Sequence, residues 1–166
     1  MPKINFKKIS LNSIIVLLIF LIDRLSKIYI LKIAELENTV DIYLTNYLNL
    51  YLIWNKGIAF GLLSINESLI YNSISLVIAL IILTILVMLI KSNGLKRYSL
   101  ILVLGGSLGN LFDRIYYSAV PDFIDFHIGN LHWFIFNVAD IFITLGIICL
   151  IYVEIFFNKQ NNETRY

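Results

Sequence analysis

Four long apolar runs dominate this 166-residue sequence and leave few folds open to it. They cover about residues 11–31, 69–90, 100–117 and 136–157. Each run is close to the roughly 20 residues that a helix needs to cross the hydrocarbon core of a bilayer. We therefore predict an all-α integral membrane protein with four transmembrane helices, folded as a single domain over residues 1–166.

The composition excludes most other classes of protein. Apolar residues make up 59% of the chain and charged residues 14%, against roughly 45–50% and about 25% in soluble domains. Such a chain is neither a water-soluble domain nor intrinsically disordered. A net charge of +2 also argues against nucleic-acid binding, which needs a concentrated basic face. Because Cys149 is the only cysteine, an intramolecular disulfide and a cysteine metal cluster are both excluded.

The distribution of basic residues predicts the orientation in the membrane. Eight of the 13 lysines and arginines lie before residue 11, in the loop 91–99 or in the tail 158–166, and short loops rich in positive charge stay in the cytoplasm. Both termini are therefore predicted to be cytoplasmic, and the outer loop 32–68 lies on the opposite side. Asp23 and Arg24 follow the first apolar stretch where a cleavage site would need small residues, so we interpret that run as an uncleaved anchor.

The outer loop 32–68 is long enough to carry structure of its own. Apolar residues alternate there with mostly polar or aromatic ones at the period of a half-buried strand: Val40, Ile42 and Leu44, then Leu48, Leu50 and Leu52. We predict a small sheet lying on the membrane surface. The polar tail 158–166 is expected to fray.

Several charged residues lie inside or at the edge of the apolar runs. They include Asp23, Asp113, Arg114 and Asp140. A charge at the bilayer centre costs roughly 2.5–3.5 kcal/mol even on the most lenient scale, so these residues need partners or a wet cavity. Asp23 and Lys27 are four residues apart on one helix face and could pair. Since the polar groups of three runs approach the outer end of the bundle, we predict one polar site near the outer leaflet.

Two carboxylates in this region are candidates for acid–base chemistry. Asp122 lies just outside the third run and Asp140 just inside the fourth. Two carboxylates brought face to face in a pocket of low dielectric share a proton, so that one acts as base and the other as acid. A water held between them could be deprotonated for attack on a carbonyl. The alternative, that each aspartate only caps a helix or pairs with an arginine, stays open on these residues alone.

Five ordered sequence blocks resemble the motifs of the lipoprotein signal peptidases, also called signal peptidase II. They are D-R-L-S-K at 23–27, N-K-G-I-A-F-G at 55–61, G-G-S-L-G-N-L-F-D-R at 105–114, V-P-D-F-I-D at 120–125 and F-N-V-A-D at 136–140. Each block alone is a weak signal, but five in order across four apolar runs make chance agreement remote.

The resemblance implies a membrane-embedded aspartic endopeptidase of the bacterial cytoplasmic (inner) membrane. Such an enzyme removes the signal peptide from prolipoproteins just before a cysteine that carries a diacylglyceryl group. The implied fold is a four-helix bundle with a small extracytoplasmic β-cradle and a short surface helix. No cofactor or metal is implied; the partners are the lipidated substrate and membrane lipid, and a monomer is sufficient. The implied residues are Asp122 and Asp140 as the catalytic pair, Asn110, Arg114, Asn137, Asn55 and Gly106 for binding or orienting substrate, and Asp23, Lys27 and Asp113 as structural support.

Two positions depart from the family pattern. Phe134 follows Trp133 where the family usually has proline, and Pro121 precedes Asp122 where valine is common. Neither change removes a catalytic group, so we expect them to affect the local shape of the loops rather than the chemistry.

A different class of protein, a small transporter or ion-relay subunit, would use Asp23, Asp113 and Asp140 as a relay. It would need polar residues through the whole membrane, whereas residues 10–22 and 141–151 offer no charged path. The G-S-L-G segment at 106–109 also belongs to a formal G-x-S-x-G pattern, but that nucleophile elbow needs a strand-to-helix turn. Inside a helical span, these small residues favour close helix packing.

Three further polar or reactive positions have simpler interpretations. His127 and His132 are five residues apart, a spacing that does not put them on one helix face, and no third ligand is evident, so we predict interfacial polar residues rather than metal ligands. Cys149 is interpreted as a small packing residue. Asp125 is near enough to Asp122 to replace it in the pair; the resemblance favours Asp122, and we interpret Asp125 as a residue that structures the loop.

Overall fold

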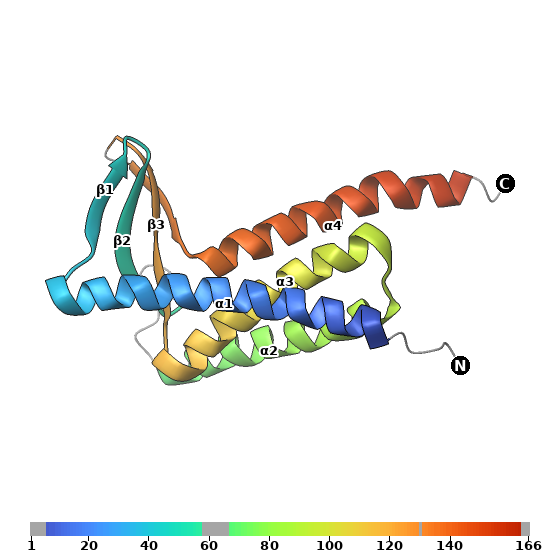
Figure 1. Ribbon diagram of the computed structural model, residues 1–166, viewed down its shortest axis with the longest axis horizontal. Coiled ribbons are helices and arrows are strands. Elements are labelled where there is room, and N and C mark those ends of the chain that lie inside the picture. Colours follow the sequence, from blue (N-terminus) through green and yellow to red (C-terminus); the bar gives the residue numbers. More distant parts are fainter. Residues whose placement is uncertain (1–5, 58–66, 130, 164–166) are drawn as a thin grey trace.

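The computed structural model describes residues 6–57, 67–129 and 131–163, and in this part of the chain it shows four helices and one four-stranded antiparallel sheet. The sheet has the strand order β1-β2-β3-β4 and stands at one end of the helices (Figure 1). The start of α1, the end of α4 and the turn between α2 and α3 lie at the other end. The elements are α1 (Phe6–Glu37), β1 (Asp41–Thr45), β2 (Leu48–Asn55), α2 (Glu67–Lys91), α3 (Gly94–Tyr117), β3 (Val120–Ile128), β4 (Leu131–Phe136) and α4 (Val138–Glu163).

The structure confirms a mostly helical chain with a small sheet, but the sheet is larger than predicted. β1 and β2 lie in the outer loop, where alternation predicted strands. β3 and β4 were not predicted, so the description all-α is wrong for residues 120–136. β3 is buried at all but three of its nine positions and therefore lacks the polar alternation of a half-buried strand.

The ends of the loop and of the chain also differ from the predictions. Residues 32–57 hold the end of α1 and the first two strands, with no surface helix, and residues 58–66 lie outside the described part. The tail predicted to fray from residue 158 continues α4 to Glu163, and 164–166 again lie outside the described part.

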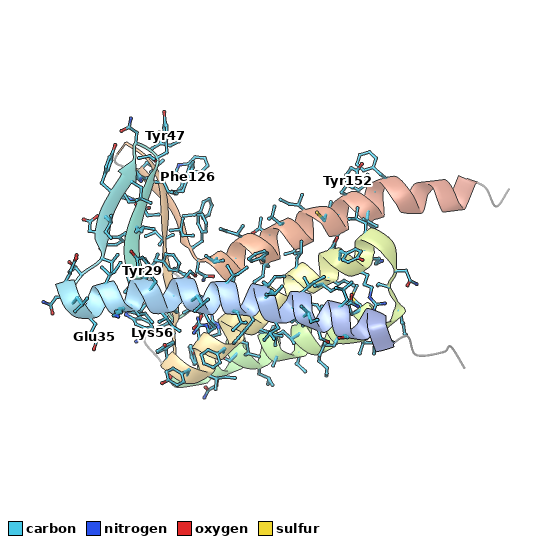
Figure 2. All side chains as sticks on the ribbon, viewed as in Figure 1. Tyr29, Glu35, Tyr47, Lys56, Phe126 and Tyr152 are labelled. Carbon is cyan, nitrogen blue, oxygen red and sulfur yellow. The ribbon has the colours of Figure 1, made fainter. Side chains whose placement is uncertain are left out.

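Two of the described helices are long and apolar enough to cross a membrane, namely α2 over Tyr71–Lys91 and α4 over Val138–Phe156. Their most apolar windows are only 11% and 17% buried within the molecule, unlike the core helix of a soluble protein. Large apolar side chains project outward along the helices, Tyr152 among them (Figure 2). An exposed apolar surface of this extent needs an apolar environment. α1 and α3 are interrupted by charged residues, which are described below.

Helix α3 packs against α1, α2 and α4, and glycines lie at its contacts with α1 and α4. A Cβ atom added to Gly105 would lie 2.8 Å from the Ile19 side chain of α1, and one added to Gly109 would lie 2.5 Å from the Asp23 carboxylate. A Cβ atom added to Gly106 would likewise lie within 3 Å of Ala139 at the start of α4. These glycines let the helix backbones approach one another, as the sequence indicated.

Gly106→Ala is expected to lower the stability of the folded chain by about 1–3 kcal/mol, the usual cost of overpacking. The added methyl group would press on the Ala139 carbonyl oxygen and lie 2.8 Å from Ile143 Cγ1, and the backbone oxygen cannot rotate away. Thermal unfolding in detergent micelles measures the loss. Ile115→Ala changes a side chain on the same helix that is 75% exposed and should leave the midpoint unchanged. Equal midpoints for Gly106→Ala and wild type would show that α3 and α4 are less tightly packed than described.

A small apolar cluster fixes the sheet on the end of α1. Its centre consists of three side chains that are each less than 5% exposed: Ile30 of α1, Val40 just before β1, and Phe123 of β3. Leu52 in β2 also donates a backbone hydrogen bond to the Val40 carbonyl (3.3 Å). As a result β3, which carries Asp122, is held directly against α1 and the start of α4.

Candidate functional site

Four charged side chains form a compact cluster between α1 and α3. Lys27 Nζ lies 2.9 Å from Asp23 Oδ2 and 2.6 Å from Asp113 Oδ2. Arg24 forms an ion pair with Asp113 and lies 3.5 Å from Asp23. The predicted Asp23–Lys27 pair is thus confirmed, as part of a larger set. Asp23, Lys27 and Asp113 have no exposed area, and two negative and two positive groups balance, which is the condition under which charges are tolerated in an apolar setting.

This cluster is connected to α4 directly through Asp23 and indirectly through Asn110 of α3. Asp23 Oδ1 accepts a hydrogen bond from the Ala139 backbone N–H (2.9 Å), and Lys27 Nζ donates to Asn110 Oδ1 (3.0 Å). Because an ammonium group can only donate, the oxygen of Asn110 faces Lys27 and its NH₂ faces the other way. That Nδ2 donates to Asp140 Oδ1 (2.7 Å). Lys27 therefore orients the amide that contacts Asp140.

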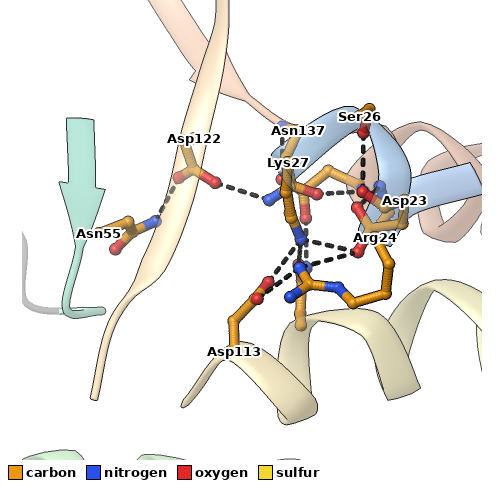
Figure 3. Close-up of polar contacts among 11 residues, drawn as sticks. Asp23, Arg24, Ser26, Lys27, Asn55, Asp113, Asp122 and Asn137 are labelled. Atoms are coloured by element: carbon orange, nitrogen blue, oxygen red, sulfur yellow. Dashed lines mark hydrogen bonds and ion pairs between the residues drawn. The ribbon is translucent and has the colours of Figure 1, made fainter. Parts of the chain in front are cut away.

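Asn137 connects Asp140 to Asp122. Its backbone N–H donates to Asp140 Oδ2 (3.1 Å), and its Oδ1 accepts from the Asp140 N–H (3.2 Å). This reciprocal pair is a capping box that starts α4. The remaining polar group of the side chain, Nδ2, donates to Asp122 Oδ1 (2.6 Å; Figure 3). One asparagine thus holds both carboxylates and the first turn of the helix in a fixed relation.

Asp122 is 2% exposed and accepts a second hydrogen bond, from Asn55 Nδ2 at the end of β2 (2.9 Å; Figure 3). Asn55 is oriented in turn by the Gly57 N–H, which donates to its Oδ1 (2.7 Å). Burial raises the pKa of Asp122 from 3.8 to about 6. The hydrogen bonds from Asn137 and Asn55 oppose this increase in pKa, and the negative charge of Asp140 adds to it. Asp122 is thus able to retain a proton in mildly acidic solution.

Arg114, predicted to orient the pair, lies at the edge of the site. Its guanidinium group packs against Gly57, where a Cβ would be 2.8 Å from Nη2, and it lies over the Tyr71 ring at 5.6 Å. Gly57 has a φ of +78°, a conformation that favours glycine. Arg114 is 8% exposed, yet its Nε and Nη1 atoms have no hydrogen-bond partner among the described residues. Within the described part of the chain, these two nitrogen atoms are available to bind a further acceptor.

A cavity of about 410 Å³ opens beside Asp140. Apart from this carboxylate and Thr144, its lining is apolar and comes from β4 and the first turns of α4: Phe134, Ile135, Phe136, Ile141 and Leu145. Phe134, one of the two departures from the family pattern, is thus part of the wall. The arrangement places a carboxylate at the edge of an apolar cavity.

Gly106 is the one predicted binding residue that the structure places elsewhere, at the contact between α3 and α4. Sequence reasoning overlooked Arg24 as a partner of Asp113, because that contact joins two helices far apart in the chain. From the sequence, Asp125 was not recognised as a third group beside His127 and His132, whereas the structure brings all three together on β3 and β4. Asp125 faces these histidines.

The family model described as signal peptidase (SPase) II matches residues 15–157. This chain belongs to the signal peptidase II family. The lipoprotein signal peptidase of Pelagibacter ubique (strain HTCC1062) is 59% identical to it, over 98% of this chain and 99% of that protein. The lipoprotein signal peptidase of Anaplasma phagocytophilum (strain HZ) is 40% identical, over 92% and 97%.

Two solved structures of bacterial membrane enzymes share the fold of this signal peptidase II chain. One has a TM-score of 0.71 at 26% identity, covering 87% of this chain and 92% of the other. The second has a TM-score of 0.66 at 24% identity, covering 95% and 94%. The family resemblance found in the sequence is confirmed, and with it the prediction of an aspartic peptidase. The alternative of a transporter or ion-relay subunit has no support.

Proposed function

We propose that Asp122 and Asp140 are the catalytic pair with which this chain cleaves signal peptides from prolipoproteins, just before a diacylglyceryl-modified cysteine. The observation that carries the proposal is the bridge formed by Asn137, which donates to Asp122 through its side chain and to Asp140 through its backbone. Membership of the signal peptidase II family supplies the reaction. No second copy of the chain is needed, because one copy provides every group named.

The environments of the two carboxylates assign their roles. Asp122, with its pKa raised to about 6, holds the shared proton and acts as general acid. Asp140, whose carboxylate oxygens accept hydrogen bonds from the N–H groups of Asn110 and Asn137, takes a proton from the attacking water. The water oxygen bonds to the carbonyl carbon while Asp122 protonates the carbonyl oxygen. When the C–N bond breaks, Asp140 returns its proton to the leaving nitrogen and Asp122 regains one from the diol.

The surrounding groups suit a substrate that enters from the membrane. A signal peptide must be unwound before its peptide bonds can be attacked, and its freed carbonyl groups then need donors. Nε and Nη1 of Arg114, which have no hydrogen-bond partner in the part of the chain that the structure describes, can serve as such donors. The apolar cavity of about 410 Å³ beside Asp140 suits apolar parts of the substrate next to the cleavage point.

The same proposal includes the placement in the bacterial inner membrane. All four helices cross it, α1 and α3 being able to do so because Asp23, Arg24, Lys27 and Asp113 neutralise one another. The end of the molecule at which α1 begins, α4 ends and α2 turns into α3 is the more basic one and faces the cytoplasm. The sheet and the catalytic pair then lie at the level of the outer leaflet, in contact with membrane lipid.

The experiment that tests the function follows cleavage of a diacylglyceryl-modified prolipoprotein peptide and its unlipidated twin by the full chain in detergent micelles. Mass spectrometry of the products should show one cut, immediately before the modified cysteine, and only in the lipidated peptide. Equal cleavage of both peptides would contradict the requirement for the lipid. Failure to cleave either peptide would contradict the peptidase function itself.

The pH dependence tests the role of Asp122. Because the acid form of Asp122 is required, kcat/KM is expected to fall as the pH rises through about 6, the pKa to which burial raises this carboxyl. In Asn55→Ala a hydrogen bond that lowers the pKa of Asp122 is lost. The pKa then rises, so the descending limb should move to higher pH whatever happens to the maximal rate. A limb that stays in place, or moves to lower pH, would show that Asp122 is not the proton donor.

A further inference from the structure

Asp125, His127 and His132 form a cluster on the β3–β4 hairpin that the proposed peptidase mechanism does not use. Asp125 and His127 are two residues apart on β3 and so share a face, and His132 of β4 is the cross-strand partner of His127. Asp125 Oδ2 lies 2.7 Å from His132 Nδ1 and 3.5 Å from His127 Nδ1. One nitrogen or oxygen atom from each of the three residues falls within 4.8 Å of the others.

Two buried polar atoms of this cluster lack hydrogen-bond partners among the described residues. Asp125 has no exposed area and His127 is 6% exposed. Among the described residues, Asp125 Oδ1 and His127 Nδ1 have no hydrogen-bond partner. A buried polar atom without a hydrogen-bond partner destabilises the fold, so a ligand that these atoms could bind would stabilise it. His132 is more than half exposed, so the cluster opens to the surroundings on one side.

The donor set matches one chemical class of ligand. Two imidazole nitrogens and one carboxylate oxygen are typical ligands of Zn²⁺, which leaves a fourth position to water. Bonds of about 2.0–2.2 Å in a tetrahedral site separate ligand atoms by about 3.3–3.5 Å. The distance from Asp125 Oδ2 to His127 Nδ1 already has this value. The 2.7 Å contact to His132 is that of a hydrogen bond, and it lengthens when a metal replaces the proton.

We propose that Asp125, His127 and His132 bind a divalent transition-metal ion, of which Zn²⁺ fits best. The site is separate from the proposed catalytic pair, since Asp122 accepts hydrogen bonds from Asn55 and Asn137, whereas Asp125 faces the histidines.

The position of the site gives the metal a structural role. The backbone N–H of His127 donates to the Tyr47 carbonyl oxygen (3.0 Å), and Tyr47 and Phe126 both lie toward the tip of the sheet, away from the helices (Figure 2). A metal bound here ties β4 to β3. β4 leads directly into Asn137, so the ion would stabilise the hairpin that joins the two catalytic aspartates.

Calorimetric titration of the metal-free chain with zinc chloride, in detergent micelles, tests the proposal. The chain must carry an affinity tag without histidine, because His127 and His132 are its only two histidines. We expect one ion per chain and a rise in the thermal unfolding midpoint, as for any ligand that binds only the folded state. Co²⁺ in place of zinc should give the visible absorption of a tetrahedral site with nitrogen ligands.

Single variants locate the binding. Asp125→Asn, His127→Gln and His132→Gln should each weaken zinc binding tenfold or more, while far-UV circular dichroism stays that of the wild type. His132→Gln protects the test against misfolding, since this side chain is largely exposed. Cys149→Ser controls for thiol binding and should change nothing. An absence of stoichiometric zinc binding by wild type overturns the proposal, as does binding that survives all three substitutions. Neither result bears on the cleavage assay described above.

Discussion

Asp140→Asn and Asp122→Asn are each expected to lower kcat by about 10³-fold or more, with little change in substrate affinity. Each substitution preserves the shape of the side chain but removes a group that, in the proposed mechanism, takes up or releases a proton. Asp140→Asn removes the proposed base that activates water, and Asp122→Asn removes the proposed acid. Because the two act as a unit, the double variant should be hardly worse than either single one.

Single-turnover cleavage of the lipidated peptide by purified variants measures this loss. Asp41→Asn is the matched control, since Asp41 is an exposed carboxylate of the same sheet, and it should cleave at the wild-type rate. If either Asp122→Asn or Asp140→Asn turned over within tenfold of the wild type, the assignment of the catalytic pair would be wrong.

Asp122→Asn should also change the pH dependence of stability. The folded-state pKa of Asp122 is raised from 3.8 to about 6, so its contribution to the free energy of unfolding is fully present below about pH 4 and is lost as the pH rises to about 6. The loss reaches at most about 3 kcal/mol. The wild type should therefore lose stability across this interval relative to Asp122→Asn, as measured by chemical unfolding in micelles. Parallel curves for the two proteins would contradict the raised pKa.

Lys27→Met is expected to destabilise the fold by about 3–5 kcal/mol, the usual cost of removing one partner from a buried ion pair. Lys27 has no exposed area and is bonded to Asp23, Asp113 and the Asn110 amide. Methionine fills a similar volume, so the effect reports the lost charge. Among the described residues, Arg24 would then be the one remaining cation paired with both aspartates.

The loss should appear as a lower unfolding midpoint in micelles. Lys32→Met, on the exposed side of the same helix, is the control and should leave the midpoint unchanged. Activity should fall as well, because the Asn110 amide that contacts Asp140 loses its orienting partner. A midpoint equal to that of the wild type would show that the cluster does not hold α1 against α3.

The parts of this structure that could be predicted from the sequence are those encoded locally. Apolar runs located the helices, and a spacing of four residues located the Asp23–Lys27 pair. The pairing of Arg24 with Asp113 depends on the packing of two distant helices, which local patterns do not specify.

The β3–β4 hairpin was missed for a different reason. β3 is buried along most of its length and has a proline at its second position. It therefore lacks the alternation of apolar and polar residues by which strands are recognised. The interpretation of His127 and His132 from their spacing assumed a helix, in which side chains five residues apart lie on different faces. In a hairpin the same spacing places them opposite each other.

The double role of Asn137 has a consequence for how the enzyme can be disabled. The cap of α4 is local, because its two hydrogen bonds lie within residues 137–140. The hydrogen bond from Asn137 Nδ2 to Asp122 is separate from the cap. A motion that separates β3 from α4 therefore breaks the connection between the two carboxylates and leaves the start of the helix intact. A small molecule wedged between β3 and α4 would inactivate the site without unwinding α4, provided that it supplied its own acceptor to the Asn137 amide.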